Sequence, residues 1–170
     1  MVSAGTTEIP SGIDAVTPQW LAAALGSDVT GVRAEQIAMD SGFSSLLYRL
    51  HLTGEGAPST VIAKLPAVSE ARGAMDLMGG YRREVAFYRD IAGRAPMATP
   101  DVHVARIADN GVDFVLLLED LGGWNNADHL AGLSMAQART CLESLADFTG
   151  GPVNRPTGLR WSSFRVSTIL

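Results

Sequence analysis

Hydrophobic and polar residues alternate in several short stretches of this chain, and that pattern predicts β-strands. Every second residue from Leu46 to Leu52 is leucine or tyrosine, as in a half-buried strand. A weaker strand pattern covers residues 29–39, and further strands are predicted at 61–64, 102–107 and 113–118. The pattern therefore predicts a five-stranded sheet.

Turn-forming residues between these stretches predict hairpins. The segment Gly-Glu-Gly-Ala-Pro at 54–58 joins the second predicted strand to the third, and Asn110-Gly111 predicts a two-residue hairpin between the last two. Because strands joined by hairpins run antiparallel, we expect the sheet to be mostly antiparallel.

Three stretches have the three-to-four residue spacing of a helix. Thr17-Pro18 is typical of a helix start, and Gly26 ends a short N-terminal helix. Residues 75–94 are predicted to form one long helix. A capping box at Ser134 and Gln137 begins a final helix. The apolar stripe of the long helix consists of Leu77, Tyr81, Val85, Tyr88, Ile91 and Ala92, and that of the final helix of Ala138, Cys141, Leu142, Leu145 and Phe148. The fold class is α+β, with one long helix packed on the sheet.

Lys64 is the only lysine among 13 basic residues, and it follows the apolar run 61–63. Arginine serves as the general surface cation in this chain, so an ammonium at the inner end of a strand indicates a specific role. The alternative is that the source favours arginine and that Lys64 survives on an edge strand.

Glu84 falls inside the apolar stripe of the predicted long helix, three residues after Tyr81 and four before Tyr88. A carboxylate that faces a core must find a partner or become neutral, because a buried unpaired charge costs several kcal/mol. Lys64, on the preceding strand, is the expected partner.

Composition narrows the function classes. With 170 residues and 46% hydrophobic content, the chain can bury the core of one domain or of one lobe. A net charge of −5 argues against nucleic acid binding. No apolar run is long enough to cross a membrane, the first residues lack a signal sequence, and Cys141 is the only cysteine, so we expect a cytoplasmic location.

Other site chemistries have little support. The three histidines lack metal-ligand spacing with Cys141, and no Gly-x-Ser-x-Gly motif of a serine hydrolase occurs. We assign no metal-ligating residue to this chain.

Four segments together resemble the N-terminal lobe of the kinase-like small-molecule phosphotransferases, the aminoglycoside phosphotransferase and choline-kinase group, and especially its ecdysteroid-kinase-like branch. The matching segments are Ser41-Gly42-Phe43-Ser44-Ser45 with Leu47-Tyr48-Arg49-Leu50, Val61-Ile62-Ala63-Lys64-Leu65-Pro66, Tyr81-Arg82-Arg83-Glu84-Val85-Ala86-Phe87-Tyr88, and Phe114-Val115-Leu116-Leu117-Leu118-Glu119-Asp120-Leu121. Their order and spacing over residues 17–148 make the signal specific.

The resemblance implies roles for these residues. Lys64 would contact the α- and β-phosphates of ATP while Glu84 holds it in place. The loop residues Gly42, Phe43, Ser44 and Ser45 would cover the phosphates, although an ordinary turn is the alternative for that loop. Glu119 to Leu121 would form the hinge that offers backbone groups to adenine, the alternative being an ordinary strand exit. The family also implies Mg²⁺, whose ligands this chain does not contain.

The catalytic motifs of the fold are not found in the sequence. There is no His-x-Asp catalytic loop, Asp128-His129 has the wrong order, and Asp147-Phe148-Thr149-Gly150 follows no catalytic loop and is interpreted as a decoy. We therefore assign no catalytic residue and expect the chain to be inactive by itself. After residue 148 the family pattern is lost, and a changed reading frame or a split gene is one hypothesis for this tail.

The expected domain organisation is an N-terminal helical segment at 1–28, a nucleotide-binding lobe at 29–121, a connector and first helix of a truncated second lobe at 122–148, and an irregular tail at 149–170. The function implied by the resemblance is that of a truncated phosphotransferase, whose intact relatives move phosphate from ATP to the hydroxyl of a small molecule. The alternatives are a non-catalytic module that binds a nucleotide or a protein, and a degenerate gene product. The expected partners are a nucleotide, the small-molecule acceptor of the intact family, and a partner chain or second copy that covers the missing lobe, with neither nucleic acid nor membrane.

Overall fold

The computed structural model describes residues 8–37, 44–67, 70–95, 98–122 and 132–150 of the 170. The chain divides into two compact units, the first comprising Met1–Gly93 and Pro100–Asp120, the second Arg94–Thr99 and Leu121–Leu170. Each unit is described by itself below.

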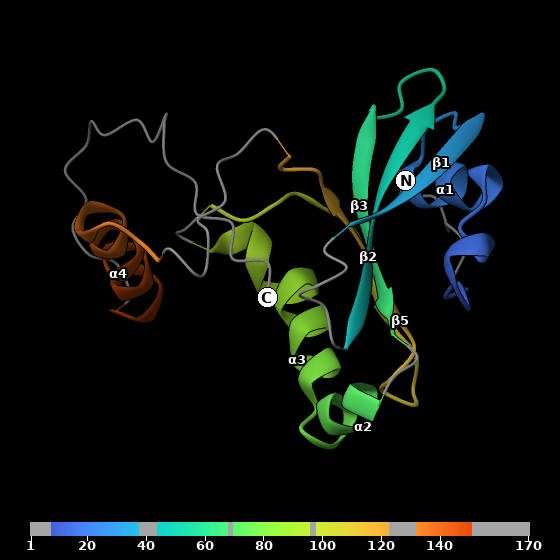
Figure 1. The fold of residues 1–170 in the computed structure, drawn as a ribbon. Helices are drawn as coiled ribbons and strands as arrows, with labels where there is room; N and C mark the ends of the chain where they lie inside the picture. The colour runs from blue at the N-terminus through green and yellow to red at the C-terminus, as the bar shows by residue number, and fades with distance from the viewer. Residues whose placement is uncertain (1–7, 38–43, 68–69, 96–97, 123–131, 151–170) are drawn as a thin grey trace. The chain divides into compact units, whose positions relative to one another are not determined.

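A five-stranded sheet is the centre of the first unit (Figure 1). Its strands are β1 (Gly31–Ile37), β2 (Ser45–Thr53), β3 (Thr60–Pro66), β4 (Val102–Ile107) and β5 (Phe114–Glu119). They lie in the order β1-β2-β3-β5-β4, and every neighbouring pair is antiparallel. The predicted α+β fold with a mostly antiparallel sheet is confirmed.

The first face of the sheet packs against the N-terminal helix α1 (Pro18–Leu25). Thr17 caps this helix by accepting a hydrogen bond from the backbone N–H of Trp20, and Gly26 ends it in the left-handed conformation, as the sequence predicts. Trp20 and Leu21 join a buried cluster with alternate residues of the strands, which are Leu50, Leu52, Val61, Ala63, Leu65, Val104, Val115 and Leu117. This face serves packing.

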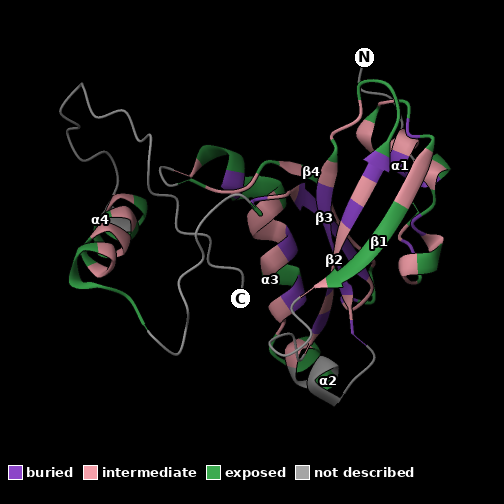
Figure 2. Cartoon of the chain, turned by 45° about the horizontal axis from the view of Figure 1, so that its top comes forward, coloured by how far each residue is buried: buried purple, intermediate pink, exposed green. Residues whose placement is uncertain are grey.

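The opposite face packs against the helix α3 (Gly80–Ala86), which Figure 1 shows alongside the sheet. Its buried cluster consists of Leu47, Ile62, Tyr81, Val85, Phe114, Leu116 and Leu118. β3 and β5 are buried along both faces and are the deepest part of the unit (Figure 2). Their near-continuous apolar sequences follow from their central place in the sheet.

The helix predicted over residues 75–94 is divided, which corrects the sequence analysis. A separate helix α2 (Glu70–Leu77) precedes α3, and α3 continues through the π-helical turn η2 (Phe87–Ile91) and the 3₁₀ turn η3 (Ala92–Arg94). Gly79 lies between α2 and α3 with φ of 64°, a left-handed conformation that ends one helix before the next begins. Leu77 therefore belongs to α2 and is 91% exposed, so it is not part of the packed stripe.

The hairpin between β4 and β5 is also longer than the sequence predicts. Ala108 donates its N–H to the carbonyl of Asp113 and so closes a four-residue loop. The side chain of Asn110 accepts hydrogen bonds from the N–H groups of Val112 and Asp113 within this loop. The Asn110 side chain thus stabilises a four-residue turn, of which Asn110-Gly111 is only a part.

The second unit contains the helix α4 (Met135–Gly150). Its predicted capping box is confirmed, because Ser134 and Gln137 exchange hydrogen bonds of 2.9 and 3.3 Å between backbone and side chain. The remainder of the predicted tail, residues 151–170, lies outside the described residues. Within the described part of the chain, no helix has the length and apolar content that a membrane span requires.

The break between α2 and α3 can be tested with two glycine variants. Gly73 lies inside α2 with open space around it, so Gly73→Ala should raise the free energy of unfolding by about 0.5–1 kcal/mol. Gly79→Ala should lower it by about 1 kcal/mol, because alanine is strained at this positive φ. Urea denaturation of both variants measures the two signs. A rise for both would indicate one continuous helix.

Candidate functional site

Lys64 projects from β3 toward the face that carries α3. On the two neighbouring strands it lies opposite Leu47 and Leu116, which both belong to the cluster on that face. Lys64 is only 5% exposed, and β3 is a central strand. The alternative of a lysine on an edge strand is therefore wrong.

The ammonium of Lys64 meets the carboxylate of Glu84 from α3. Lys64 Nζ donates to Glu84 Oε1 at 2.5 Å, and the side chains are 7% and 24% exposed. This ion pair is the one that the sequence predicts. A buried ammonium with a carboxylate beside it keeps its charge in a place where an isolated charge would be costly.

The position of Glu84 follows from the packing of α3. Tyr81 and Val85 on either side of it are fully buried against the sheet, so the turn between them faces Lys64. Burial, with a smaller contribution from the negative charge of Glu84, raises the pKa of Tyr88 one turn later. Tyr88 is therefore a neutral neighbour of the ion pair at physiological pH.

Helix α3 also holds the end of the loop that precedes β2. The Tyr81 hydroxyl donates to the carbonyl oxygen of Ser44 at 2.5 Å, and the backbone N–H of Ala67 donates to the same oxygen at 3.1 Å. Ser45 begins β2, where it is buried opposite Pro66. The predicted loop residues Gly42 and Phe43 lie outside the described residues, so the loop is placed only at its last positions.

The predicted hinge begins where β5 ends. The N–H and the carboxylate of Glu119 both bind the backbone of Asp101, at 2.8 and 3.1 Å. Glu119 thus fastens the end of β5 to the chain before β4. Leu121 is the first residue of the second unit after the sheet, and its role in binding adenine stays a prediction.

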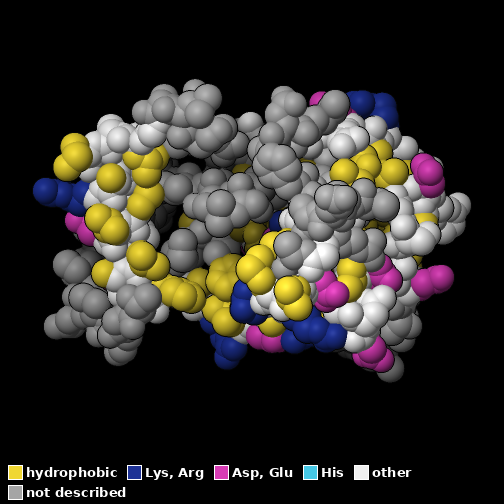
Figure 3. Space-filling model, turned by 60° about the horizontal axis from the view of Figure 1, so that its bottom comes forward, with side chains coloured by type: hydrophobic (Ala, Val, Ile, Leu, Met, Phe, Trp, Pro, Cys, Tyr) yellow, Lys and Arg dark blue, Asp and Glu magenta, His cyan; other side chains and the backbone are white. Residues whose placement is uncertain are grey.

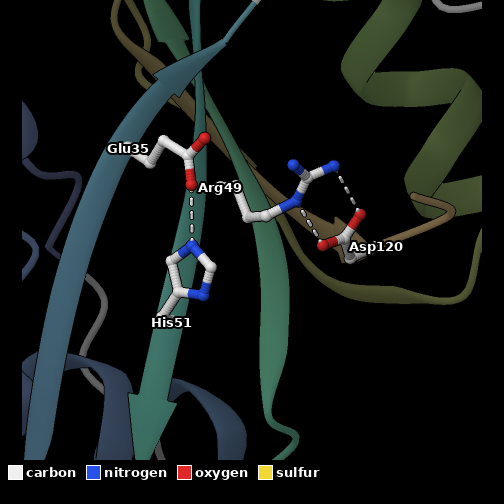
Figure 4. A network of polar contacts seen from close by, with 4 residues as sticks. All are labelled: Glu35, Arg49, His51 and Asp120. Atoms are coloured by element: carbon white, nitrogen blue, oxygen red, sulfur yellow. Dashed lines mark hydrogen bonds and ion pairs between the residues drawn. The ribbon is translucent and has the colours of Figure 1, made fainter. Parts of the chain in front are cut away.

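A polar network that the sequence analysis missed lies near the same strand exit (Figure 4). Arg49 on β2 binds both carboxylate oxygens of Asp120, at 2.7 and 3.3 Å. His51 binds Glu35 on β1 at 2.8 Å, and this hydrogen bond lowers the pKa of Glu35. The only signal in the sequence was an arginine in an apolar strand, because 71 residues separate Arg49 from its partner.

The described residues include no group of three or more histidine, cysteine, aspartate or glutamate side chains close enough to hold a metal ion. Near one end of the sheet face under α3 lie Lys64, Glu84, Ser44 and Ser45, and near the other end lies Asp120. The arrangement offers a buried positive charge to an anion, and Mg²⁺ ligands are not identified among the described residues.

Replacing Glu84 and replacing Lys64 should lower the free energy of unfolding by different amounts. Glu84→Gln removes the carboxylate that pairs with a buried ammonium and should lower the free energy of unfolding by about 2–3 kcal/mol. Lys64→Met should cost only about 1 kcal/mol, since the more exposed carboxylate of Glu84 can reach water. Chemical denaturation of both variants and of the double variant measures the coupling. Equal and additive losses would contradict a buried pair.

Comparison with known proteins agrees with this geometry. The model of the ecdysteroid kinase-like family matches residues 40–153, which is two thirds of the chain. The match starts after the N-terminal helix and extends beyond residue 148, where the sequence analysis placed the loss of the family pattern. Searches of curated proteins and of solved structures found no match. The chain belongs to the ecdysteroid kinase-like family, a kinase-like family related to phosphotransferases.

Proposed function

We propose that this chain is the nucleotide-binding lobe of a small-molecule phosphotransferase and binds ATP on the face of the sheet that carries Lys64. The observation that carries the proposal is the buried ion pair of Lys64 and Glu84, formed by the only lysine of the chain. A fixed ammonium on a central strand, oriented by a helix carboxylate, is the phosphate-binding arrangement of kinase folds.

The residues present fit a phosphate group. Lys64 provides a compact positive charge with N–H donors, and Glu84 holds that charge in one position, so little reorganisation is needed when an anion binds. Tyr81 fixes the carbonyl of Ser44 at the same end of the face, so the chain enters β2 from a fixed point. In this proposal that loop covers the phosphates with Gly42, Phe43, Ser44 and Ser45.

The far end of the face would receive the base. β5 and the residues after it, Glu119 to Leu121, would offer backbone groups to adenine in this proposal. Mg²⁺ would accompany ATP, as the kinase-like family implies, but we assign it no ligand in this chain. ATP supplies the transferable phosphoryl group, and this lobe binds and orients it.

Phosphate transfer itself is not proposed for the 170 residues alone. Kinase folds need a catalytic aspartate in a His-x-Asp-like loop, and the sequence contains no such motif. The acceptor would be a hydroxyl group of a small molecule, as in the related phosphotransferases, and the groups that select it are not among those identified here. A cytoplasmic location fits a single cysteine and a nucleotide ligand.

Thermal stabilisation by ATP tests the proposal. At ten times its dissociation constant, ATP should stabilise the chain by about 1.4 kcal/mol, which raises Tm by a few degrees. Lys64→Met should abolish the shift, because the phosphate loses its cation. Arg83→Gln is the matched control, since Arg83 lies beside Glu84 in sequence but is exposed on α3.

Three results would contradict the proposal in different ways. No shift of Tm with millimolar ATP, with or without Mg²⁺, would exclude the nucleotide site. A shift that persists in Lys64→Met would place the nucleotide elsewhere. Phosphate transfer from ATP to an added alcohol by the purified chain would show that catalytic groups are present after all.

A second candidate function is a non-catalytic module that binds a partner chain. Helix α4 supports it, because Met135, Leu142 and Leu145 are 87%, 65% and 52% exposed. Figure 3 shows hydrophobic side chains gathered along this helix, at the left of the view. Such a row of exposed apolar side chains is typical of an interaction surface.

Self-association of the chain tests this candidate. If α4 binds a second copy, the apparent mass in sedimentation should rise with protein concentration, because buried apolar area favours the dimer. Leu142→Glu should return the chain to a monomer, since a carboxylate would be buried at the contact. Glu143→Gln, on an adjacent exposed position of α4, should leave association unchanged. A monomer at all concentrations would remove the support for self-association.

A further inference from the structure

The charged side chains of Figure 4 lie on the same face of the sheet as Lys64. On β2, Leu47 is the residue opposite Lys64, and Arg49 follows two positions later, which places both on one face. Arg49 lies opposite Ile62 of β3, and Ile62 lies opposite Leu118 of β5. The Arg49 side chain therefore crosses β3 from β2 to the end of β5, about 7 Å along the strands from Lys64.

The contact of Arg49 with Asp120 has the geometry of a strong ion pair. Nε and Nη2 bind the two carboxylate oxygens, which fixes the orientation as well as the distance. The side chain of Asp120 is 8% exposed and that of Arg49 29%. The hydrogen bonds that Arg49 donates to Asp120 raise the pKa of the Arg49 guanidinium, so the pair stays charged.

Asp120 follows directly after β5 and is the last residue of the first unit. The ion pair therefore fastens the exit of the sheet to β2, a strand that is not its neighbour in the sheet order. Glu35 lies opposite Arg49 on β1, and its charge also stabilises the guanidinium.

We propose that Arg49 and Asp120 are positioning residues for the base of the bound nucleotide. The pair holds Asp120, the residue directly after β5, at a fixed distance from β2 and so shapes the end of the site that lies away from Lys64. This inference rests on the proposed nucleotide site. It gives the two ends of the site two separate ion pairs on one sheet face, of which Lys64 and Glu84 serve the phosphates and Arg49 and Asp120 position the groups that meet the base.

Two ligands separate the two ends of the site. ATP carries base and phosphates, whereas inorganic tripolyphosphate carries the phosphates alone. In Arg49→Gln and Asp120→Asn, the dissociation constant of ATP should rise about tenfold, because the charge-assisted contact that fixes the end of β5 is lost. The dissociation constant of tripolyphosphate should stay within about twofold, since Lys64 and Glu84 are unchanged.

Two further variants control the experiment. Arg89→Gln removes an arginine that binds Asp90 with two hydrogen bonds of 2.9 and 2.8 Å on an exposed helix surface, and it should change neither affinity. The double variant Arg49→Asp/Asp120→Arg keeps an ion pair between β2 and the end of β5. It should bring the ratio of the dissociation constants of ATP and tripolyphosphate back toward that of the natural chain, even where a single variant fails to fold.

The outcomes distinguish this inference from the function on which it rests. If the natural chain binds ATP more tightly than tripolyphosphate and the variants keep that ratio, the pair has no role at the base and the inference is overturned. An equal loss of both ligands in folded variants would show a general structural role and would also overturn it. If the natural chain binds neither ligand, the proposed function falls, and this inference falls with it.

Discussion

The buried ion pair between Lys64 and Glu84 is the contact on which the rest of the site depends. It joins a central strand to the helix packed on that strand, and it places a positive charge where the chain otherwise buries leucine, isoleucine and phenylalanine. Such a pair gains little stability over apolar side chains of the same size, because both charges lose water. In the proposed function, an anion that the ammonium meets explains this pair, and the stability of the fold does not.

The two faces of the sheet divide packing from chemistry. The face under α1 is filled by an apolar cluster, and the face under α3 combines an apolar cluster with the charged side chains of Lys64 and Arg49. Strand geometry permits this division because successive side chains point to opposite faces. Because one face of the sheet buries an apolar cluster, the other face can carry charged side chains without loss of that cluster.

Helix α3 connects the groups at one end of that face. Tyr81 holds the carbonyl of Ser44 directly before β2, and Glu84 holds Lys64 one turn later. A shift of α3 would therefore move Ser44 and the charge together. At the other end, Arg49 and Asp120 restrain the exit of β5, so the face is bounded by contacts between segments that are remote in the sequence.

The sequence by itself determined the five strands, their antiparallel hairpins and the pairing of Lys64 with Glu84, because alternation, helical spacing and the cost of a buried charge are local or pairwise constraints. It did not determine the break at Gly79, which depends on one backbone conformation inside a periodic pattern. Only the tertiary structure decided that Arg49 meets Asp120. Strand order brings them together across β3, and no spacing rule connects residues on strands whose order in the sheet is not yet known.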